Sequence, residues 1–128
     1  AFNMLKPGGR FLMATWCHRP EPPELTTREQ SFLKDMCSAY HLPYIISNPS
    51  YAQLAKEEGF KHVQIEDWTN AVAPFWPAVG RSARSFRSVA GLLQAGWPTI
   101  RGALAMRYMM RGYKTGLIRF GVLKAVKP

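Results

Sequence analysis

The stretch LKPGGRFLMATWCHR, residues 5–19, joins a chain turn to a run of apolar residues. Its Pro-Gly-Gly sequence at residues 7–9 stops any helix that precedes it and favours a tight turn. Residues 10–17 are almost continuously apolar, which is typical of a strand buried on both faces in a parallel sheet. The stretch therefore predicts the last turn of a helix at residues 1–6, a turn, and one buried strand of an α/β sheet.

Two helices are predicted after this strand. The first begins at Thr26 or Thr27, because Glu29 follows Thr26 at the spacing of a capping box. The second has Pro49 in its first turn, where the missing N–H of proline costs nothing, and it ends at Gly59.

Two further strands are predicted, one on each side of a long helical segment. Residues 60–68 alternate, with Phe60, His62 and Gln64 expected on one face. Residues 117–127 form the last strand. A strand that returns after a long helical segment is able to pair antiparallel with the others, which is a common arrangement in mixed sheets.

The helical segment between these strands, residues 68–116, has a composition of its own. It opens with an apolar, aromatic stretch that prolines interrupt, and it continues with helices predicted over residues 78–95 and 98–114. Each predicted helix carries an apolar stripe and a basic stripe. We expect residues 1–128 to be the C-terminal fragment of one domain, and residues 68–116 to be a lid-like insert within it.

The charges divide the chain in two. All eight acidic residues lie in residues 1–67 beside seven Lys and Arg, so that this half has a formal charge of −1. Residues 68–128 hold ten Lys and Arg and no acid, a charge of +10. This asymmetry favours an anionic partner, namely a membrane surface, a nucleic acid or an acidic protein. It is equally expected if the basic half packs against an acidic part of the protein that lies outside this sequence.

Cysteine usage and hydropathy exclude several classes of protein. Cys17 and Cys37 are the two cysteines, and both fall in apolar patterns that predict buried free thiols. No His and Cys residues have the spacing of a zinc site, so no metal is expected. No run of about 18 apolar residues predicts a transmembrane helix, and the first residues do not resemble a signal peptide.

Several motifs together resemble one enzyme family. LKPGGRFLMATW at residues 5–16 is similar to the turn and fifth strand of class I S-adenosylmethionine-dependent methyltransferases. TWCHR at residues 15–19, EDWTNAVAPFWPAV at residues 66–79 and the stretch from residue 102 to the end resemble the γ-tocopherol methyltransferase branch of that family. The resemblance extends over nearly the whole chain.

The resemblance implies a fold, and it implies that the acceptor and the cofactor are bound by different halves of the domain. The chain would supply strands five to seven of a Rossmann-like sheet, with the last strand inserted antiparallel. The glycine-rich loop and the acidic residue that hold S-adenosylmethionine would lie in a missing N-terminal half, because no such loop occurs here. No cofactor-binding residue is therefore assigned in this chain, which alone is expected to be inactive.

The predicted reaction is methyl transfer to a small apolar acceptor, by resemblance a tocopherol-like prenylated phenol methylated on carbon. A small-molecule N-methyltransferase of the same branch, or a basic module that binds nucleic acid or membrane, remains an alternative. Against nucleic acid, no Lys- and Arg-rich run and no known binding motif is present. The expected location is the cytoplasm or a membrane surface, and the plastid if the source is a plant.

Candidate site residues follow from where strands end, since ligands of open α/β sheets bind beyond the carboxyl ends of the strands. His18 follows the first strand and suits a general base that removes a phenol proton. Asp67 follows the second and is able to orient a hydroxyl group, or simply to cap a helix or pair with a cation. Loop hydrogen bonding remains the alternative for His18.

Aromatic residues near these ends are candidates for the wall of an acceptor cavity or for ordinary core packing. Their rings suit an apolar acceptor, and their faces attract a sulfonium cation. The predicted substrate-binding residues are Trp16, Trp68, Phe75 and Trp76.

The insert is also predicted to dock on an anionic membrane, because a prenylated acceptor resides in lipid. Three aromatic residues are expected near the membrane interface and four arginines near the headgroups: Trp76, Phe86 and Trp97, and Arg84, Arg87, Arg107 and Arg111.

Overall fold

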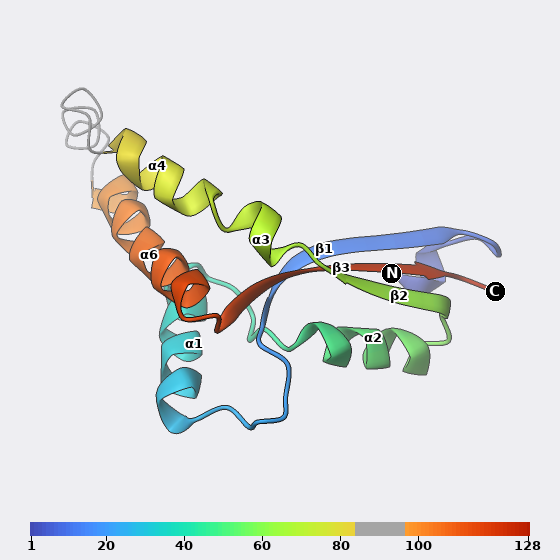
Figure 1. Ribbon diagram of the computed structural model, residues 1–128. Helices are drawn as coiled ribbons and strands as arrows, with labels where there is room; N and C mark the ends of the chain where they lie inside the picture. Colours follow the sequence, from blue (N-terminus) through green and yellow to red (C-terminus); the bar gives the residue numbers. More distant parts are fainter. Residues whose placement is uncertain (84–96) are drawn as a thin grey trace.

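The computed structural model describes residues 1–83 and 97–128 of the chain (Figure 1). After a short 3₁₀ helix (η1), three strands follow, and successive strands are separated by several helices. In chain order the elements are η1 (Phe2–Met4), β1 (Arg10–His18), α1 (Thr27–Ala39), α2 (Asn48–Glu57), β2 (Lys61–Asp67), α3 (Thr69–Val72), α4 (Phe75–Ala83), α6 (Trp97–Lys114) and β3 (Ile118–Val126).

The three strands form one sheet in the order β1-β3-β2, and β3 is antiparallel to both neighbours. This confirms the antiparallel last strand and shows that it lies between the other two. Since β1 and β2 both run against β3, they run parallel to each other. Their carboxyl ends, at His18 and Asp67, therefore lie at the same edge of the sheet, opposite Ile118 and Gly121 of β3.

The helix starts agree with their sequence signals. Thr26 caps α1, and Glu29 completes the capping box by accepting a hydrogen bond from the Thr26 backbone N–H. Ser47 caps α2, and Pro49 lies in its first turn. Gly59 follows α2 with a φ of 97°, a conformation that favours glycine. The turn before β1 also forms as predicted, although residues 1–6 contain a 3₁₀ helix rather than an α-helical end.

The predicted alternation in the second strand is wrong in detail. A register shift between Lys61 and Gln64 interrupts the pairing of β2 with β3, and His62 has a φ of 51°. A bulge of this kind changes the direction of the side chains that follow it. Phe60 is buried just before the strand, whereas Ile65, which follows the bulge, is 41 % exposed.

Two separate cores hold the helices to the sheet. In one, α2 packs beneath the sheet through Ala52 and Ala55 against Phe60 and Leu123 (Figure 1). The other lies at the end of the sheet, where α1, α4 and α6 come together, and its fully buried side chains include Leu33, Met36, Met109 and Ile118. Both predicted thiols are free and buried, and burial raises the pKa of Cys17 to about 11.

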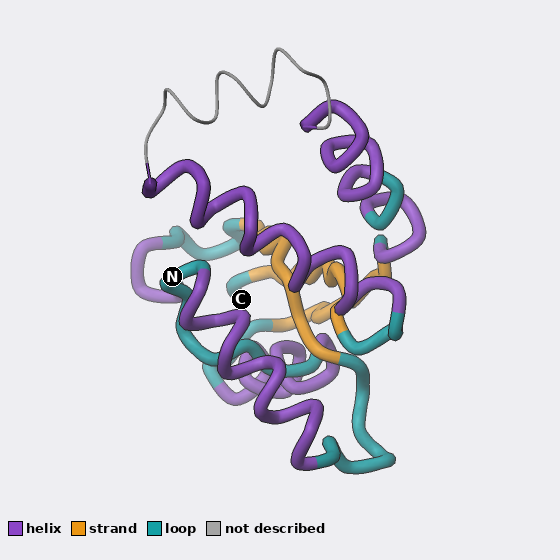
Figure 2. The backbone as a smooth tube through the Cα atoms, turned by 90° about the vertical axis from the view of Figure 1, so that its left-hand side faces the viewer, coloured by secondary structure: helices purple, strands orange, loops and turns teal. Residues whose placement is uncertain are grey.

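The insert is helical where it is described. Figure 2 shows α4 and α6 as two helical arms that project from the sheet. The predicted helix over residues 78–95 begins earlier, as α4, and its part beyond residue 83 lies outside the described residues, as do Arg84, Phe86 and Arg87. The predicted helix over residues 98–114 is α6.

Candidate functional site

Four aromatic side chains meet beside the carboxyl end of β1. The Trp16 ring lies 6.0 Å from the rings of both Tyr40 and Trp76, and Trp76 lies 6.4 Å from Tyr113. The four belong to β1, to the end of α1, to α4 and to α6. We call Trp16, Tyr40, Trp76 and Tyr113 the aromatic cluster; it brings together two of the predicted wall residues and adds two tyrosines.

Three polar atoms of the aromatic cluster are buried without a partner. Within the described residues, no group meets hydrogen-bond geometry with the Tyr40 hydroxyl, the Trp76 indole nitrogen or the Tyr113 hydroxyl. Leaving such a group unsatisfied costs about 1–3 kcal/mol. Burial raises the pKa of both tyrosines, and for Tyr113 it outweighs the opposing effect of the Trp76 and Trp16 indoles beside its hydroxyl, so that each hydroxyl stays protonated and able to donate. These atoms are suited to a ligand that brings its own polar group.

Next to the cluster lies an apolar cavity of about 420 Å³. Pro74 and Trp76 line it from the start of α4, and Met110 and Tyr113 line it from α6. A cavity of this size and lining accommodates a small apolar molecule.

The predicted interface position of Trp76 is wrong. Trp76 is 8 % exposed and packs against Trp16, Phe75 and Tyr113. It turns inward because α4 lies against α6, so that its ring completes the core between these helices. The Trp97 side chain, also predicted at the interface, lies outside the described residues.

Trp68 and Phe75, the other two predicted wall residues, lie on the surface. Trp68 is 47 % exposed, and its indole nitrogen donates to Glu66 at 2.8 Å. Phe75 is 57 % exposed and touches the cluster only through Trp76, at a ring distance of 5.2 Å. Neither the Trp68 side chain nor the Phe75 side chain lines the apolar cavity.

His18 is buried at the end of β1 in a well-defined tautomer. Its Nδ1 donates to the Arg19 carbonyl oxygen at 2.7 Å, which leaves Nε2 as the proton acceptor of the neutral ring. Nε2 lies 3.9 Å from the Glu21 carboxylate. His18 lines a cavity of about 570 Å³ together with Ser47, which differs from the cavity beside the aromatic cluster. The expected hydrogen bond to the loop backbone is present, and the base role stays a prediction.

Asp67 is engaged on both carboxylate oxygens. One accepts from the Thr69 backbone N–H at 2.8 Å, and the other accepts from Arg119 at 3.2 Å. Partial burial raises the pKa of Asp67, but the hydrogen bonds from Thr69 and Arg119 outweigh it, so that the pKa lies below its ordinary value. Asp67 thus joins β2 to β3 and opens α3, and its part in a reaction stays a prediction.

Neither the glycine turn before β1 nor the two acids at the sheet edge fit the binding of a nucleotide-like cofactor. The turn glycine Gly9 packs against the carbonyl oxygen of Lys6, where an added Cβ would lie 2.7 Å away, so that the turn closes on itself and forms no cradle. Of the two acids at the sheet edge, Glu66 pairs with Lys124 and Asp67 pairs with Arg119. No group of three or more His, Cys, Asp or Glu residues in the described part of the chain is placed to hold a metal ion.

The sequence aligns over nearly its full length with three plant methyltransferases, although no family model matches it. It is 42 % identical over 125 residues to a probable chloroplastic tocopherol O-methyltransferase of Oryza sativa, and 39 % identical to that of Arabidopsis thaliana. Each alignment covers 95 % of this chain but only 34 % and 36 % of the relatives. Norajmaline N-methyltransferase of Rauvolfia serpentina is 25 % identical over 118 residues, 89 % of this chain and 40 % of its own.

Solved structures share the fold at low sequence identity. A cyclopropane synthase from Mycobacterium tuberculosis matches 98 % of this chain with a TM-score of 0.74 and 15 % identity, over 47 % of its own length. A phosphoethanolamine N-methyltransferase from Haemonchus contortus, in complex with S-adenosyl-L-methionine, matches 99 % with a TM-score of 0.73 and 16 % identity, over 28 % of its length. The chain is therefore a homologue of the tocopherol O-methyltransferases, and its fold is that of the C-terminal part of Rossmann-like S-adenosylmethionine-dependent methyltransferases.

Proposed function

We propose that this chain is the acceptor-binding part of an S-adenosylmethionine-dependent methyltransferase that acts on a small apolar phenol. The single observation that carries the proposal is the aromatic cluster, in which buried, unpartnered donors face apolar surroundings at the ligand edge of the sheet. The relatives named tocopherol O-methyltransferases indicate a tocopherol-like acceptor.

The cluster's chemistry suits a phenol with an apolar tail. The Trp76 indole N–H and the protonated Tyr113 hydroxyl are able to donate to the phenol oxygen, which removes the cost of leaving both unpaired. The apolar lining from Pro74 and Met110 favours a hydrocarbon tail and excludes water from the ring. These contacts position the acceptor, and positioning is a large part of catalysis in a direct group transfer.

His18 is the proposed base. In the tautomer that the Arg19 carbonyl fixes, its Nε2 accepts a proton; because His18 lines a different cavity from the one beside the aromatic cluster, this role requires the phenol hydroxyl to point towards His18. Loss of the phenol proton raises the electron density of the oxygen and of the ring carbons ortho and para to it. The Trp76 and Tyr113 donors would occupy the oxygen, which leaves a ring carbon to take the methyl group from the sulfonium and then to release its own proton. We therefore propose methylation on carbon, although the curated relatives carry names that specify oxygen.

The methyl donor is held by residues outside this chain. The chain spans about a third of the length of the curated relatives it matches, and neither its glycine turn nor the two acids at the sheet edge fit a nucleotide-like cofactor. β1 supports the same view, because it pairs with one strand in the described sheet, and Leu12 on one face of that sheet is 66 % exposed. The isolated chain is accordingly expected to bind no S-adenosylmethionine and to transfer no methyl group.

We further propose that the full-length protein associates peripherally with an anionic membrane, where a prenylated acceptor resides. None of the described helices is long and apolar enough to cross a membrane. The support is the basic charge of residues 68–128. Since the relatives are named as chloroplastic, the proposed location for a plant protein is the plastid.

A second candidate function is methyl transfer to an amine. It is favoured by the alignment with norajmaline N-methyltransferase. Aromatic faces such as those of Trp16 and Trp76 also suit a cationic amine.

Methyl transfer from labelled S-adenosylmethionine by the full-length protein tests the proposal. The acceptor panel contains a prenylated phenol, the same phenol without its tail, and a secondary amine of similar size. We expect the prenylated phenol to be the best acceptor, with the new methyl group on a ring carbon by NMR. A product methylated on oxygen would refute carbon as the site, and transfer to the amine alone would favour the second candidate.

A further inference from the structure

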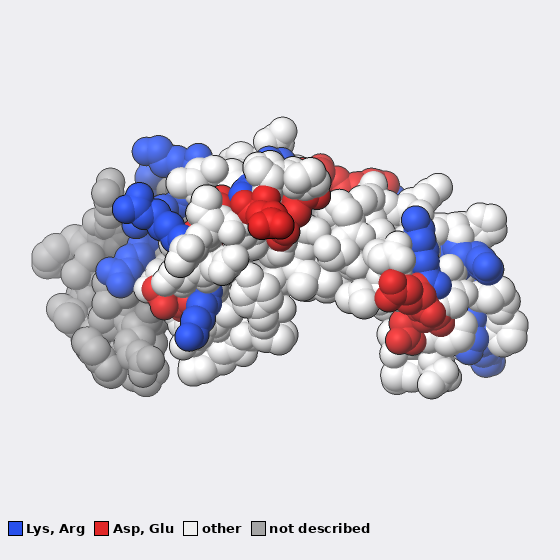
Figure 3. All heavy atoms as spheres, turned by 90° about the horizontal axis from the view of Figure 1, so that it is seen from below, with Lys and Arg blue, Asp and Glu red and all other residues white. Residues whose placement is uncertain are grey.

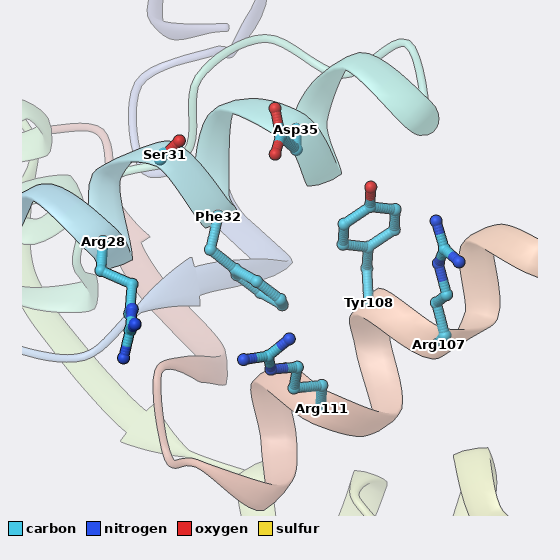
Figure 4. A pocket seen from close by; sticks show the side chains of 7 residues that line it. All are labelled: Arg28, Ser31, Phe32, Asp35, Arg107, Tyr108 and Arg111. Carbon is cyan, nitrogen blue, oxygen red and sulfur yellow. The ribbon is translucent and has the colours of Figure 1, made fainter.

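A basic groove lies between α1 and α6, and it is separate from the apolar cavity (Figure 4). Its volume is about 730 Å³. Figure 4 shows side chains that enter it from both helices: Arg28, Ser31, Phe32 and Asp35 from α1, and Arg107, Tyr108 and Arg111 from α6. Arg28, Ser31, Asp35, Arg107 and Arg111 are exposed, so the groove opens at the surface.

The three arginines of the groove are not neutralised by the residues around them. Within the described part of the chain, the guanidinium groups of Arg28, Arg107 and Arg111 make no hydrogen bond and no ion pair, whereas those of Arg19 and Arg119 each pair with a carboxylate. Of the residues that line the groove, Asp35 is the one acid. Three guanidinium groups against one carboxylate leave a local charge of about +2 at neutral pH.

Aromatic rings hold two of these guanidinium groups in place. Arg111 lies over the Phe32 ring at 5.9 Å, and Arg107 lies over the Tyr108 ring at 5.4 Å. A guanidinium that stacks on a ring keeps its N–H donors free at its edge. The groove therefore presents oriented donors with no protein acceptor, which is the requirement for binding a phosphate group.

The groove continues onto an outward basic face of α6. Arg107, Met110, Arg111 and Lys114 are all exposed, and their spacing places them on one side of the helix. Figure 3 shows Lys and Arg side chains gathered at this end of the molecule. Met110 adds an apolar contact beside the cations and also lines the apolar cavity.

We propose that the groove between α1 and α6 binds the phosphate of an anionic phospholipid headgroup, with Arg28, Arg107 and Arg111 as its ligands. Ser31 and Tyr108 supply hydroxyl donors to the same phosphate. The outward stripe of cations around Met110 favours a lipid surface over a small soluble phosphate, because an exposed apolar side chain gains from contact with lipid. The proposal rests on the proposed membrane association and names the residues that produce it.

Vesicle co-sedimentation of the full-length protein tests the groove. Vesicles of phosphatidylcholine alone are compared with vesicles that contain 30 % phosphatidylglycerol, for the wild type and for the triple variant Arg28→Gln, Arg107→Gln, Arg111→Gln. The control variant Lys6→Gln, Lys56→Gln, Lys61→Gln removes the same charge from exposed lysines outside the groove. We expect the groove variant to weaken binding to the anionic vesicles by roughly 100-fold, since each basic residue at an anionic leaflet strengthens binding about fivefold. The control variant should weaken it far less.

Each alternative result has its own meaning. Equal loss in both variants would overturn the groove and leave only diffuse electrostatic attraction. Equal binding of the wild type to both vesicles would overturn the phosphate site while membrane association survives, and binding to neither would overturn both. Calorimetric titration of the full-length protein with inorganic phosphate is the last measurement. If the protein binds inorganic phosphate tightly but does not bind vesicles, the groove is a site for a soluble phosphate. If the wild type binds the anionic vesicles but transfers no methyl group, the proposed reaction is refuted and the proposed phosphate site still stands.

Discussion

At the scale of single residues, the proposal depends on His18 and on the tyrosines of the aromatic cluster. For His18→Ala in the full-length protein we expect turnover to fall by about 10²–10⁴, because the phenol proton loses its acceptor. The KM for the acceptor should change much less, since the cavity beside the cluster does not depend on His18. Steady-state kinetics measure both constants, and an unchanged turnover number would leave His18 a structural residue of the loop.

Tyr113 tests whether the unpartnered donors serve a ligand. Tyr113→Phe removes a buried hydroxyl that has no hydrogen-bond partner in the described residues, so the free energy of unfolding should stay the same or increase by about 1 kcal/mol. The KM for the phenol should rise roughly tenfold if that hydroxyl donates to the acceptor. Tyr108→Phe, in the basic groove, is the matched control for KM. A less stable protein with an unchanged KM would contradict the assignment.

At the level of elements, Arg19 ties the loop after β1 to the first turn of α1. Its guanidinium donates twice to Glu29, which also accepts from Thr26 in the capping box. The Arg19 hydrogen bond, followed by those from Thr26, lowers the pKa of Glu29 to about 2. A carboxylate whose folded pKa is depressed stabilises the protein above its unfolded pKa, and this stabilisation is lost as the pH falls towards the folded value.

The variant Glu29→Gln makes that pH dependence measurable. At pH 7 the wild type should be more stable than the variant, and the difference should shrink below about pH 4.5 and vanish near pH 2. Denaturant unfolding of the full-length protein at several pH values gives the two curves. Glu58→Gln, which removes an exposed carboxylate without an ion pair in the described structure, is the control. A difference that stays constant from pH 7 to pH 3 would refute the linkage.

Gly112 sets how closely α6 approaches β3. A Cβ at this position would lie 2.3 Å from Cγ1 of Ile118, which is fully buried and has no room to move. We expect Gly112→Ala to destabilise the protein by about 1–3 kcal/mol in thermal or denaturant unfolding. Gly80→Ala in α4 is the control, because within the described residues its Cβ would meet only the flexible Met110 side chain, at 3.4 Å, and alanine favours a helix. Equal effects of the two substitutions would contradict the close contact.

Local signals predicted the elements, whereas the site depended on long-range packing. The Pro-Gly-Gly turn, the capping box at Thr26 and the glycine after α2 each act within a few residues, so the sequence reveals them directly. The bulge in β2 arises from pairing with β3, more than fifty residues away, and no local pattern reports it. For the same reason the sequence predicted Trp16 and Trp76 as wall residues but missed Tyr113, whose ring joins them only after α6 packs against α4. Its place in the last turn of a predicted helix gave no separate signal.

For the molecule as a whole, the distribution of charge and the open edge of the sheet distinguish two regions of the surface. The acids of the first half pair with cations in part within this chain, as Glu29, Glu66 and Asp67 do, whereas the arginines of the basic groove stay unpaired in the described residues. The open outer edge of β1 indicates where further strands would join. In our proposal the chain supplies an acceptor site and a basic surface, and the rest of the protein binds the cofactor.

The substitution Trp76→Phe in the full-length protein tests this division of labour most directly, through two constants measured side by side. It removes the indole donor and part of the wall beside the apolar cavity but keeps an aromatic ring in the core. Our account predicts a KM for the prenylated phenol that rises roughly tenfold, and a Kd for S-adenosylmethionine by calorimetry that stays within about twofold of the wild-type value. A weaker Kd for S-adenosylmethionine with an unchanged KM for the phenol would contradict it, because the cluster would then serve the cofactor and not the acceptor.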